Sequence, residues 1–197
     1  MKTNNRQMKN LYYTAVYATP VNALLVLDTE GRLYYASLGQ NITDLQNLLV
    51  KDFRSQSHVQ LKPLSTLTDK IKAENTIAKF KQLIEDPKEP QDIPIEILFG
   101  TRLQRRVWQE LIDIPVGQVK TYGQIAERLD LSEKFARAVG AGCGANRIAI
   151  VIPCHRVVGA DRKLTGYRYG TETKAYLLKH ELGNKFSEMV LQGVGKN

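Results

Sequence analysis

Cysteine and histidine are scarce in this sequence. The 197 residues contain only two cysteines, Cys143 and Cys154, and three histidines. Two cysteines are too few for a disulfide framework, and so few thiols and imidazoles do not favour a structural zinc site. We therefore expect two free thiols in a reducing, cytoplasmic environment, with neither a metal nor a cofactor.

Long apolar runs are also missing. The sequence has no segment of 18 apolar residues, so no membrane span is predicted, and residues 1–10 lack the apolar region of a secretory signal. The composition, with 43% hydrophobic and 24% charged residues, is that of a globular protein. Together these features predict a soluble chain with one or two domains.

Acidic residues are outnumbered, and the excess of positive charge is uneven. The formal net charge is +8. Residues 100–182 carry 14 basic and 8 acidic side chains and hold 9 of the 12 arginines, whereas residues 1–99 are nearly balanced. Because guanidinium groups bind phosphates and base edges well, the basic half favours nucleic acid as a partner. On charge alone, a merely solubilising surface explains the pattern equally well.

The apolar pattern indicates a mixed first half and a mostly helical second half. In the first half it predicts strands at 12–17, 23–27, 32–37 and 95–99, and helices at 44–54 and 66–86. In the second half it predicts helices that begin at Thr101 and that span 121–129 and 133–143. We expect an α/β domain at 1–90, a mostly α domain at 91–185 and a tail at 186–197, which is α+β overall.

The two short helices predicted at 121–129 and 133–143 surround a tight turn, which is the outline of a helix-turn-helix. The second helix is rich in small residues, among them Ala136, Ala138 and Gly140. A helix face made of small residues lets the helix backbone closely approach a minor groove or another part of the protein. The pattern alone leaves both DNA binding and plain packing open.

The most informative segment is Ala149-Ile-Val-Ile-Pro-Cys-His-Arg-Val-Val-Gly159. A neighbouring imidazole and arginine can lower the pKa of a thiol such as Cys154 and so produce a nucleophile. Sequence neighbours rarely face each other, so His155 would act across one water. It would also need a carboxylate, for which Glu181 is a candidate that spacing alone cannot select. An ordinary buried core thiol is the alternative.

The run Ile152-Pro-Cys-His-Arg-Val157 resembles the active-site signature of the methylated-DNA–protein-cysteine methyltransferases, also called O6-alkylguanine-DNA alkyltransferases. The resemblance extends from Phe99 to Leu182, and Gly166-Tyr-Arg-Tyr-Gly170 is most similar to the C-terminal methyltransferase of the bacterial adaptive-response (Ada) type. Further segments that match in the expected order are Val107-Trp-Gln109, Ile114-Pro-Val-Gly117, Thr121-Tyr122, Arg137-Ala-Val-Gly140, Ala145-Asn146, Leu164-Thr-Gly-Tyr167 and Leu177-Leu-Lys-His-Glu181.

The resemblance implies a DNA-repair protein that moves an alkyl group from O6 of guanine in duplex DNA to its own cysteine, once per molecule. O4-alkylthymine is a further candidate substrate, and no obligate protein partner is implied. In that scheme Cys154 accepts the alkyl group and His155 is its base through a water. Glu181 polarises His155, and Asn146 holds the turn ahead of the site.

The resemblance also implies minor-groove binding and extrusion of the target base from the duplex. Arg137 would fill the vacated stack, and Tyr122 would crowd the phosphate 3′ to the target and protonate guanine N3. The DNA-binding residues implied are Arg137, Ala136, Ala138, Gly140 and Tyr122. The substrate pocket implied consists of Tyr167, Arg168, Val157, Trp108 and Lys174.

Three side chains depart from the family pattern. Phe135 stands where a smaller residue is expected, which alters how its helix seats in a groove. Arg168, with Tyr169, replaces a small pair found in many members, and we expect the two to narrow the pocket toward methyl groups.

Three other functions stay open. A cysteine hydrolase built on Cys154, His155 and Glu181 would turn over repeatedly. A helix-turn-helix transcription factor would discriminate strongly among DNA sequences. A non-catalytic relative that only flags damage would lack the acceptor cysteine, which is present in this sequence.

Overall fold

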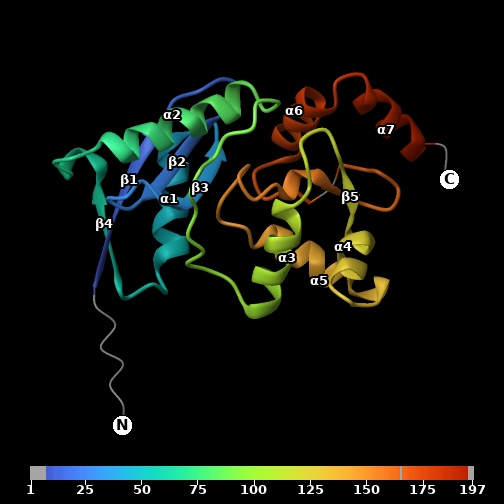
Figure 1. The fold of residues 1–197 in the computed structure, drawn as a ribbon, viewed down its shortest axis with the longest axis horizontal. Helices are drawn as coiled ribbons and strands as arrows, with labels where there is room; N and C mark the ends of the chain where they lie inside the picture. Colours follow the sequence, from blue (N-terminus) through green and yellow to red (C-terminus); the bar gives the residue numbers. More distant parts are fainter. Residues whose placement is uncertain (1–7, 165, 195–197) are drawn as a thin grey trace, which may run out of the picture.

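The computed structural model describes residues 8–164 and 166–194. Figure 1 shows a sheet and the two helices that pack on it in the left half of the view, and a mostly helical part that contains the C-terminus in the right half. None of the helices in these two ranges combines the length and the apolar character needed to cross a membrane.

A four-stranded sheet forms the N-terminal part. β1 pairs with β2 and β2 with β3 in antiparallel fashion, whereas β1 and β4 are parallel. The apolar run that forms β2 is buried on both faces, because a helix covers each side of the sheet. In spatial order the strands are β3 (Leu33–Gly39), β2 (Asn22–Leu27), β1 (Lys9–Val16) and β4 (Val59–Pro63).

Alternate residues of β2 point to opposite helices. Leu24 and Val26 pack with α1 (Ile42–Phe53), while Leu25 and Leu27 belong to the core that α2 (Ile71–Glu85) covers. This period of two is what a strand between two layers requires. The same core continues into the C-terminal part and includes Cys154, so the two parts share one apolar interior.

Within the described residues, the C-terminal part consists of five α-helices, two short 3-10 helices and a pair of two-residue strands. Thr101 and Thr121 each begin a helix with a capping box, in which the threonine and the glutamine three residues later satisfy each other's backbone amides. The elements are α3 (Arg102–Ile112), β5 (Lys120–Thr121), α4 (Tyr122–Arg128), α5 (Ala136–Gly144), β6 (Val157–Val158), α6 (Thr171–Leu182) and α7 (Lys185–Val194). The two short helices predicted around a turn are α4 and α5, and they pack on each other and on α3.

Backbone hydrogen bonds join the sheet to the second part at the edge strand β3. The Ala36 amide donates to Arg147 O at 2.8 Å, and the Ala149 amide donates to Ala36 O at 3.0 Å. These bonds cover the free edge of the sheet. They also fix the segment that leads into Cys154.

Three expectations differ from the structure. The strand predicted at 95–99 is wrong, because only an isolated bridge from Ile95 to Leu33 forms there. The strand β4 was not predicted, because its sequence, Val-Gln-Leu-Lys-Pro, is short and ends in a proline. It has no strong apolar pattern, which agrees with its partial burial. The segment expected as a tail after residue 185 instead forms α7, whose Met189 packs against Leu178 of α6.

Candidate active site

Cys154 begins the short 3-10 helix η3 (Cys154–Arg156), directly after an irregular turn. Within that turn Ile150 is buried and has a φ of 66°, a conformation that a β-branched side chain rarely adopts. Such backbone strain persists only where the surroundings impose it, and it is frequent at functional sites. The turn therefore holds Cys154 in a defined place.

The side chain of Asn146 holds this turn together. Its Oδ1 accepts a hydrogen bond from the Ile148 amide at 2.8 Å. Its Nδ2 lies 3.3 Å from Ile148 O, 2.9 Å from Ile152 O and 3.2 Å from Cys154 Sγ. The residue is fully buried, so each of these bonds replaces one that water would otherwise make. Asn146 thus bonds both the turn and the sulfur.

His155, Glu181 and Arg156 form a buried charged group beside the cysteine. His155 Nε2 lies 2.9 Å from Glu181 Oε1. Arg156 donates through Nε to Glu181 Oε2 and through Nη2 to Oε1, both at 2.9 Å, and through Nη1 to Ile114 O at 2.6 Å. The structure therefore selects Glu181 as the carboxylate that the sequence could only suggest. It also places Arg156, which the sequence suggested only as a charge near the thiol, on the same carboxylate.

The protonation states of this group follow from its burial and its hydrogen bonds. Burial lowers the pKa of His155 and outweighs the opposing effect of Glu181, so the imidazole is neutral. Burial acts to raise the pKa of Glu181, but its bonds to His155 and Arg156 prevail and lower it. A neutral imidazole that donates Nε2–H to a carboxylate keeps a lone pair on Nδ1. That Nδ1 is buried and has no hydrogen-bond partner among the described residues.

The expected low thiol pKa is not what the structure gives. Burial raises the pKa of Cys154, although the Asn146 hydrogen bond and the charge of Lys174 act in the opposite direction. Only 3% of Cys154 is exposed, which explains why desolvation dominates. The sulfur is therefore a thiol in the free protein, and a base must remove its proton before it can attack.

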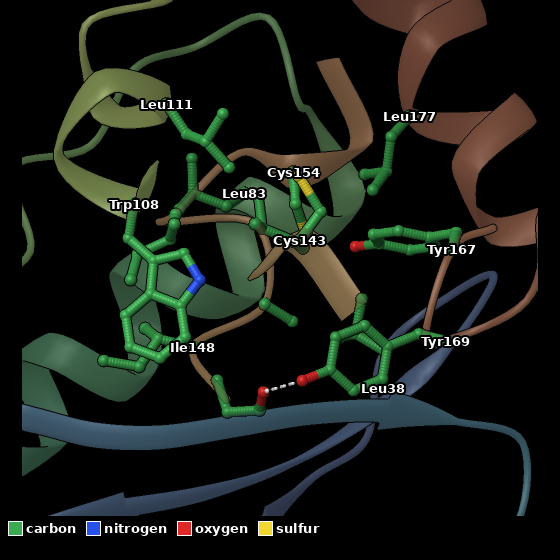
Figure 2. Packing of buried hydrophobic residues seen from close by; sticks show 14 of the residues in the cluster. Leu38, Leu83, Trp108, Leu111, Cys143, Ile148, Cys154, Tyr167, Tyr169 and Leu177 are labelled. Carbon is green, nitrogen blue, oxygen red and sulfur yellow. Dashed lines mark hydrogen bonds between the residues drawn. The ribbon is translucent and has the colours of Figure 1, made fainter. Parts of the chain in front are cut away.

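Lys174 and Tyr167 approach the thiol from the C-terminal segment. Lys174 is buried in α6 and donates from Nζ to Val157 O at 2.6 Å. Figure 2 shows the hydroxyl of Tyr167 pointing toward Cys154 and Cys143. That hydroxyl is buried and lacks a hydrogen-bond partner within residues 8–164 and 166–194. An unpaired buried hydroxyl is costly, so Tyr167 is suited to meet a polar group of a substrate.

Tyr122 lies where α4 and α5 meet the site. A Cβ added to Gly140 would sit 3.8 Å from the Tyr122 ring, and one added to Gly166 would sit 3.8 Å from its hydroxyl oxygen. Burial, with smaller contributions from the charges of Cys143 and Cys154, raises the pKa of Tyr122 to about 12. The phenol is therefore protonated at neutral pH and can act as a proton donor.

Small residues lie on both the inward and the outward face of α5. Gly142 faces inward, where an added Cβ would lie 3.4 Å from atoms of Val107, so a glycine allows α5 and α3 to approach closely. On the outer face Arg137 and Ala141 are exposed, one helical turn apart. The remaining DNA-binding candidates are half-buried: Ala136, Ala138, Gly140 and Tyr122. The outer face of α5 is thus flat and carries one long cationic side chain.

Three residues expected in a substrate pocket have other roles. Trp108 lies in the core and donates from Nε1 to Gly142 O at 2.8 Å, and Val157 is fully buried in the same core. Arg168 contacts both carboxylate oxygens of Asp52 in α1, at 3.0 and 2.8 Å. Its guanidinium is therefore engaged with the N-terminal part. The expectation that Arg168 and Tyr169 narrow an alkyl pocket stays a prediction.

Sequence reasoning missed the cluster around Asp52, which connects the two parts of the chain. Besides Arg168, the carboxylate pairs with Arg147 at 3.1 Å and accepts a hydrogen bond from the Tyr35 hydroxyl at 3.0 Å. Tyr169 adds a further link, because its hydroxyl lies 3.1 Å from Ala36 O and 3.0 Å from Asn146 O. No local sequence signal marks these contacts, since the partners are far apart along the chain.

The buried neutral imidazole makes folding sensitive to acid. His155 has a pKa below its ordinary value of 6.5 in the folded protein, so the unfolded chain binds a proton first as the pH falls. The free energy of unfolding therefore does not depend on His155 well above pH 6.5, where the imidazole is neutral in both states. It decreases as the pH falls from 6.5 toward the folded pKa, because only the unfolded chain binds the proton. Denaturant unfolding between pH 8 and 5 should show this loss in wild type and in the exposed-site control His180→Gln, but not in His155→Gln. An equal pH dependence in all three proteins would contradict it.

Comparison with known proteins places the chain in a family. Residues 102–183 match the family model described as 6-O-methylguanine DNA methyltransferase, DNA binding domain. A methylated-DNA–protein-cysteine methyltransferase of Candida albicans is 53% identical over 175 residues, which cover 88% of this chain and 98% of that protein. One of Saccharomyces cerevisiae is 38% identical over 184 residues, covering 90% and 96%.

A solved structure agrees over the whole fold. The Mycobacterium tuberculosis protein OGT in complex with DNA is 27% identical and superposes with a TM-score of 0.64, covering 94% of this chain and 99% of that one. This agreement confirms the predicted α+β fold. The chain therefore belongs to the methylated-DNA–protein-cysteine methyltransferases, which bind DNA and act in its repair.

Proposed function

We propose that this protein repairs duplex DNA carrying O6-alkylguanine by transferring the alkyl group to Sγ of Cys154, and that O4-alkylthymine is a further substrate. The observation that carries the proposal is the buried thiol of Cys154, bound by Asn146 and adjacent to a neutral imidazole. His155 in turn has its carboxylate partner Glu181 at 2.9 Å. This is the arrangement that an activated cysteine nucleophile requires.

The transfer follows from these groups. His155 removes the thiol proton through its free Nδ1 across one water, and Glu181 stabilises the imidazolium that results. Sγ attacks the alkyl carbon, an S–C bond forms, and the C–O6 bond breaks with its electron pair left on guanine. The protonated hydroxyl of Tyr122 supplies a proton to guanine N3, so unmodified guanine leaves. A thioether is a poor leaving group, so each molecule acts once.

DNA is engaged through the outer face of α5. A flat helix with small exposed residues fits the narrow minor groove, and contacts to phosphates supply affinity without reading the sequence. The target base is buried in the duplex and must be extruded, at a cost of a few kcal/mol. Arg137 is exposed on this face and makes no ion pair within the described part of the chain. Its guanidinium enters the stack in place of the extruded base.

Arg137→Ala should therefore slow repair of duplex DNA far more than reaction with the free modified base. Losing the group that fills the stack should reduce the single-turnover rate on an O6-methylguanine duplex by about tenfold or more. The reaction with free O6-benzylguanine needs no extrusion and should change little. Arg54→Ala, an exposed arginine at the end of α1, is the control. Equal losses on both substrates would remove the stack-filling role.

Intact-mass spectrometry tests the proposed reaction directly. Incubation with O6-methylguanine duplex should add one methyl group, about 14 Da, on the Cys154 peptide. Product should appear in one burst of one equivalent, whereas a cysteine hydrolase would continue to turn over. A sequence-specific transcription factor would gain no mass and would prefer one DNA sequence. An unmodified Cys154 peptide in folded protein would refute the proposal.

A further inference from the structure

Phe135 differs from the other phenylalanines of this protein. Its side chain is 47% exposed, whereas Phe53 and Phe80 are buried, and Phe99 and Phe186 pack against apolar clusters. About half of the Phe135 side chain therefore stays in water and gains no burial energy from the fold. Packing within the protein does not account for that exposed half of the ring.

The backbone around Phe135 is fixed without help from its ring. The Phe135 amide donates to Ser132 O at 2.8 Å, and the Ser132 hydroxyl caps the short helix η2 (Glu133–Phe135). Glu133 rests on α4, since a Cβ added to Gly123 would lie 2.9 Å from its Cγ. The turn is thus held by its neighbours, and the ring is presented in a defined place at the start of α5.

The surroundings of the ring match a polyanion whose stacked base pairs can admit an apolar side chain. Lys134 on one side and Arg137 on the other are both exposed, and neither forms an ion pair among the residues that the structure describes. Unpaired cations bind phosphates, and minor-groove proteins often insert an apolar side chain between base pairs. A ring between two such cations is therefore placed to contact the bases themselves.

We propose that Phe135 is a second wedge, which enters the minor groove at the base step beside the one that Arg137 occupies. Residues two apart span at most about 7 Å, which is about two base-pair rises, so the ring reaches a neighbouring step. Partial unstacking there bends the duplex and reduces the work of extruding the target base. The inference rests on the function proposed above, because it assumes that α5 faces DNA.

Three variants test the wedge. Phe135→Ala should bind an unmodified duplex about tenfold more weakly and slow transfer from an O6-methylguanine duplex by a similar factor. Phe135→Leu keeps an apolar wedge and should retain most of both activities. Ile71→Ala removes another exposed apolar side chain, 76% exposed on α2, and should change neither. Thermal unfolding of each variant checks that the fold is kept.

Two further measurements distinguish a wedge from a structural role. Reaction with free O6-benzylguanine should be the same for Phe135→Ala and wild type, because no base step is opened. A 2-aminopurine placed beside the lesion should brighten when wild type binds and stay quenched with Phe135→Ala. Duplex binding equal to wild type, an equal loss on the free base, or an unresponsive 2-aminopurine would overturn the wedge.

The experiments distinguish failure of the repair proposal from failure of the wedge proposal. If wild type takes no methyl group from DNA, the repair proposal falls, whatever Phe135 does. The duplex-binding comparison between wild type, Phe135→Ala and Ile71→Ala does not depend on transfer, so it still decides whether the ring contacts DNA.

Discussion

Replacing Cys154 with alanine should abolish methyl uptake from O6-methylguanine DNA and leave duplex binding within about twofold of wild type. The substitution removes the acceptor sulfur, whereas the cationic outer face of α5 is unchanged. The turn should survive as well, because Asn146 keeps its bonds to Ile148 and to Ile152 O. Intact mass after incubation with lesion duplex measures uptake, and fluorescence anisotropy of labelled duplex measures binding.

Cys143 offers a matched control for this experiment. It is also a buried thiol, 2% exposed, and burial likewise raises its pKa. The Asn146 side chain donates to the sulfur of Cys154, whereas Asn146 bonds Cys143 through the backbone carbonyl, and no histidine follows Cys143 in sequence. Cys143→Ala should still gain one methyl group. Methyl uptake by Cys154→Ala, or loss of uptake only in Cys143→Ala, would show that the acceptor was assigned to the wrong sulfur.

The parts of the site that could be predicted are those encoded locally. The run from Pro153 to Val157 predicted Cys154 as the candidate nucleophile, because few sequences place cysteine, histidine and arginine together after an apolar segment. Thr101 and Thr121 predicted helix starts, since a capping box needs only residues three positions apart. Both kinds of signal concern neighbours along the chain, whose contacts hardly depend on the rest of the fold.

The contacts that could not be predicted join residues far apart in sequence. Asp52 and Arg168 are separated by 116 residues, and Tyr169 and Ala36 by 133. Asp52 lies on a helix where an acidic residue normally faces solvent, and nothing nearby indicates that two arginines would enclose it. The failed strand at 95–99 has the same cause, because an apolar segment pairs only where the fold offers it a partner.

These distant contacts give the N-terminal part a role at the active site. β3 holds residues 147–149 by backbone hydrogen bonds, and the Asp52 carboxylate binds Arg147 in the same segment. Tyr169 links Ala36 of β3 to Asn146, which in turn bonds the thiol of Cys154. The sheet therefore supports the strained turn from outside, and the charged group around Glu181 completes the site from α6.

Exchanging Glu181 for glutamine should slow transfer by about two orders of magnitude at neutral pH. The amide has the size of the carboxylate but no charge, so it cannot stabilise the imidazolium that forms when His155 takes the thiol proton. It also leaves the largely buried Arg156 without its counterion, and breaking such a pair costs about 3–5 kcal/mol of stability. Single-turnover rates and denaturant unfolding measure the two losses separately. Glu172→Gln, an exposed acid in the first turn of the same helix, should change the rate little.

The pH dependence of the Glu181→Gln variant separates loss of the base from loss of structure. The pKa of Cys154 lies above its ordinary value, so alkaline pH increases the thiolate fraction without help from His155. As the pH rises toward that pKa, the variant should therefore recover and its deficit relative to wild type should shrink. A purely structural defect would leave the ratio of the two rates constant across the pH range. A constant ratio in folded protein would thus exclude His155 as the base that activates the sulfur.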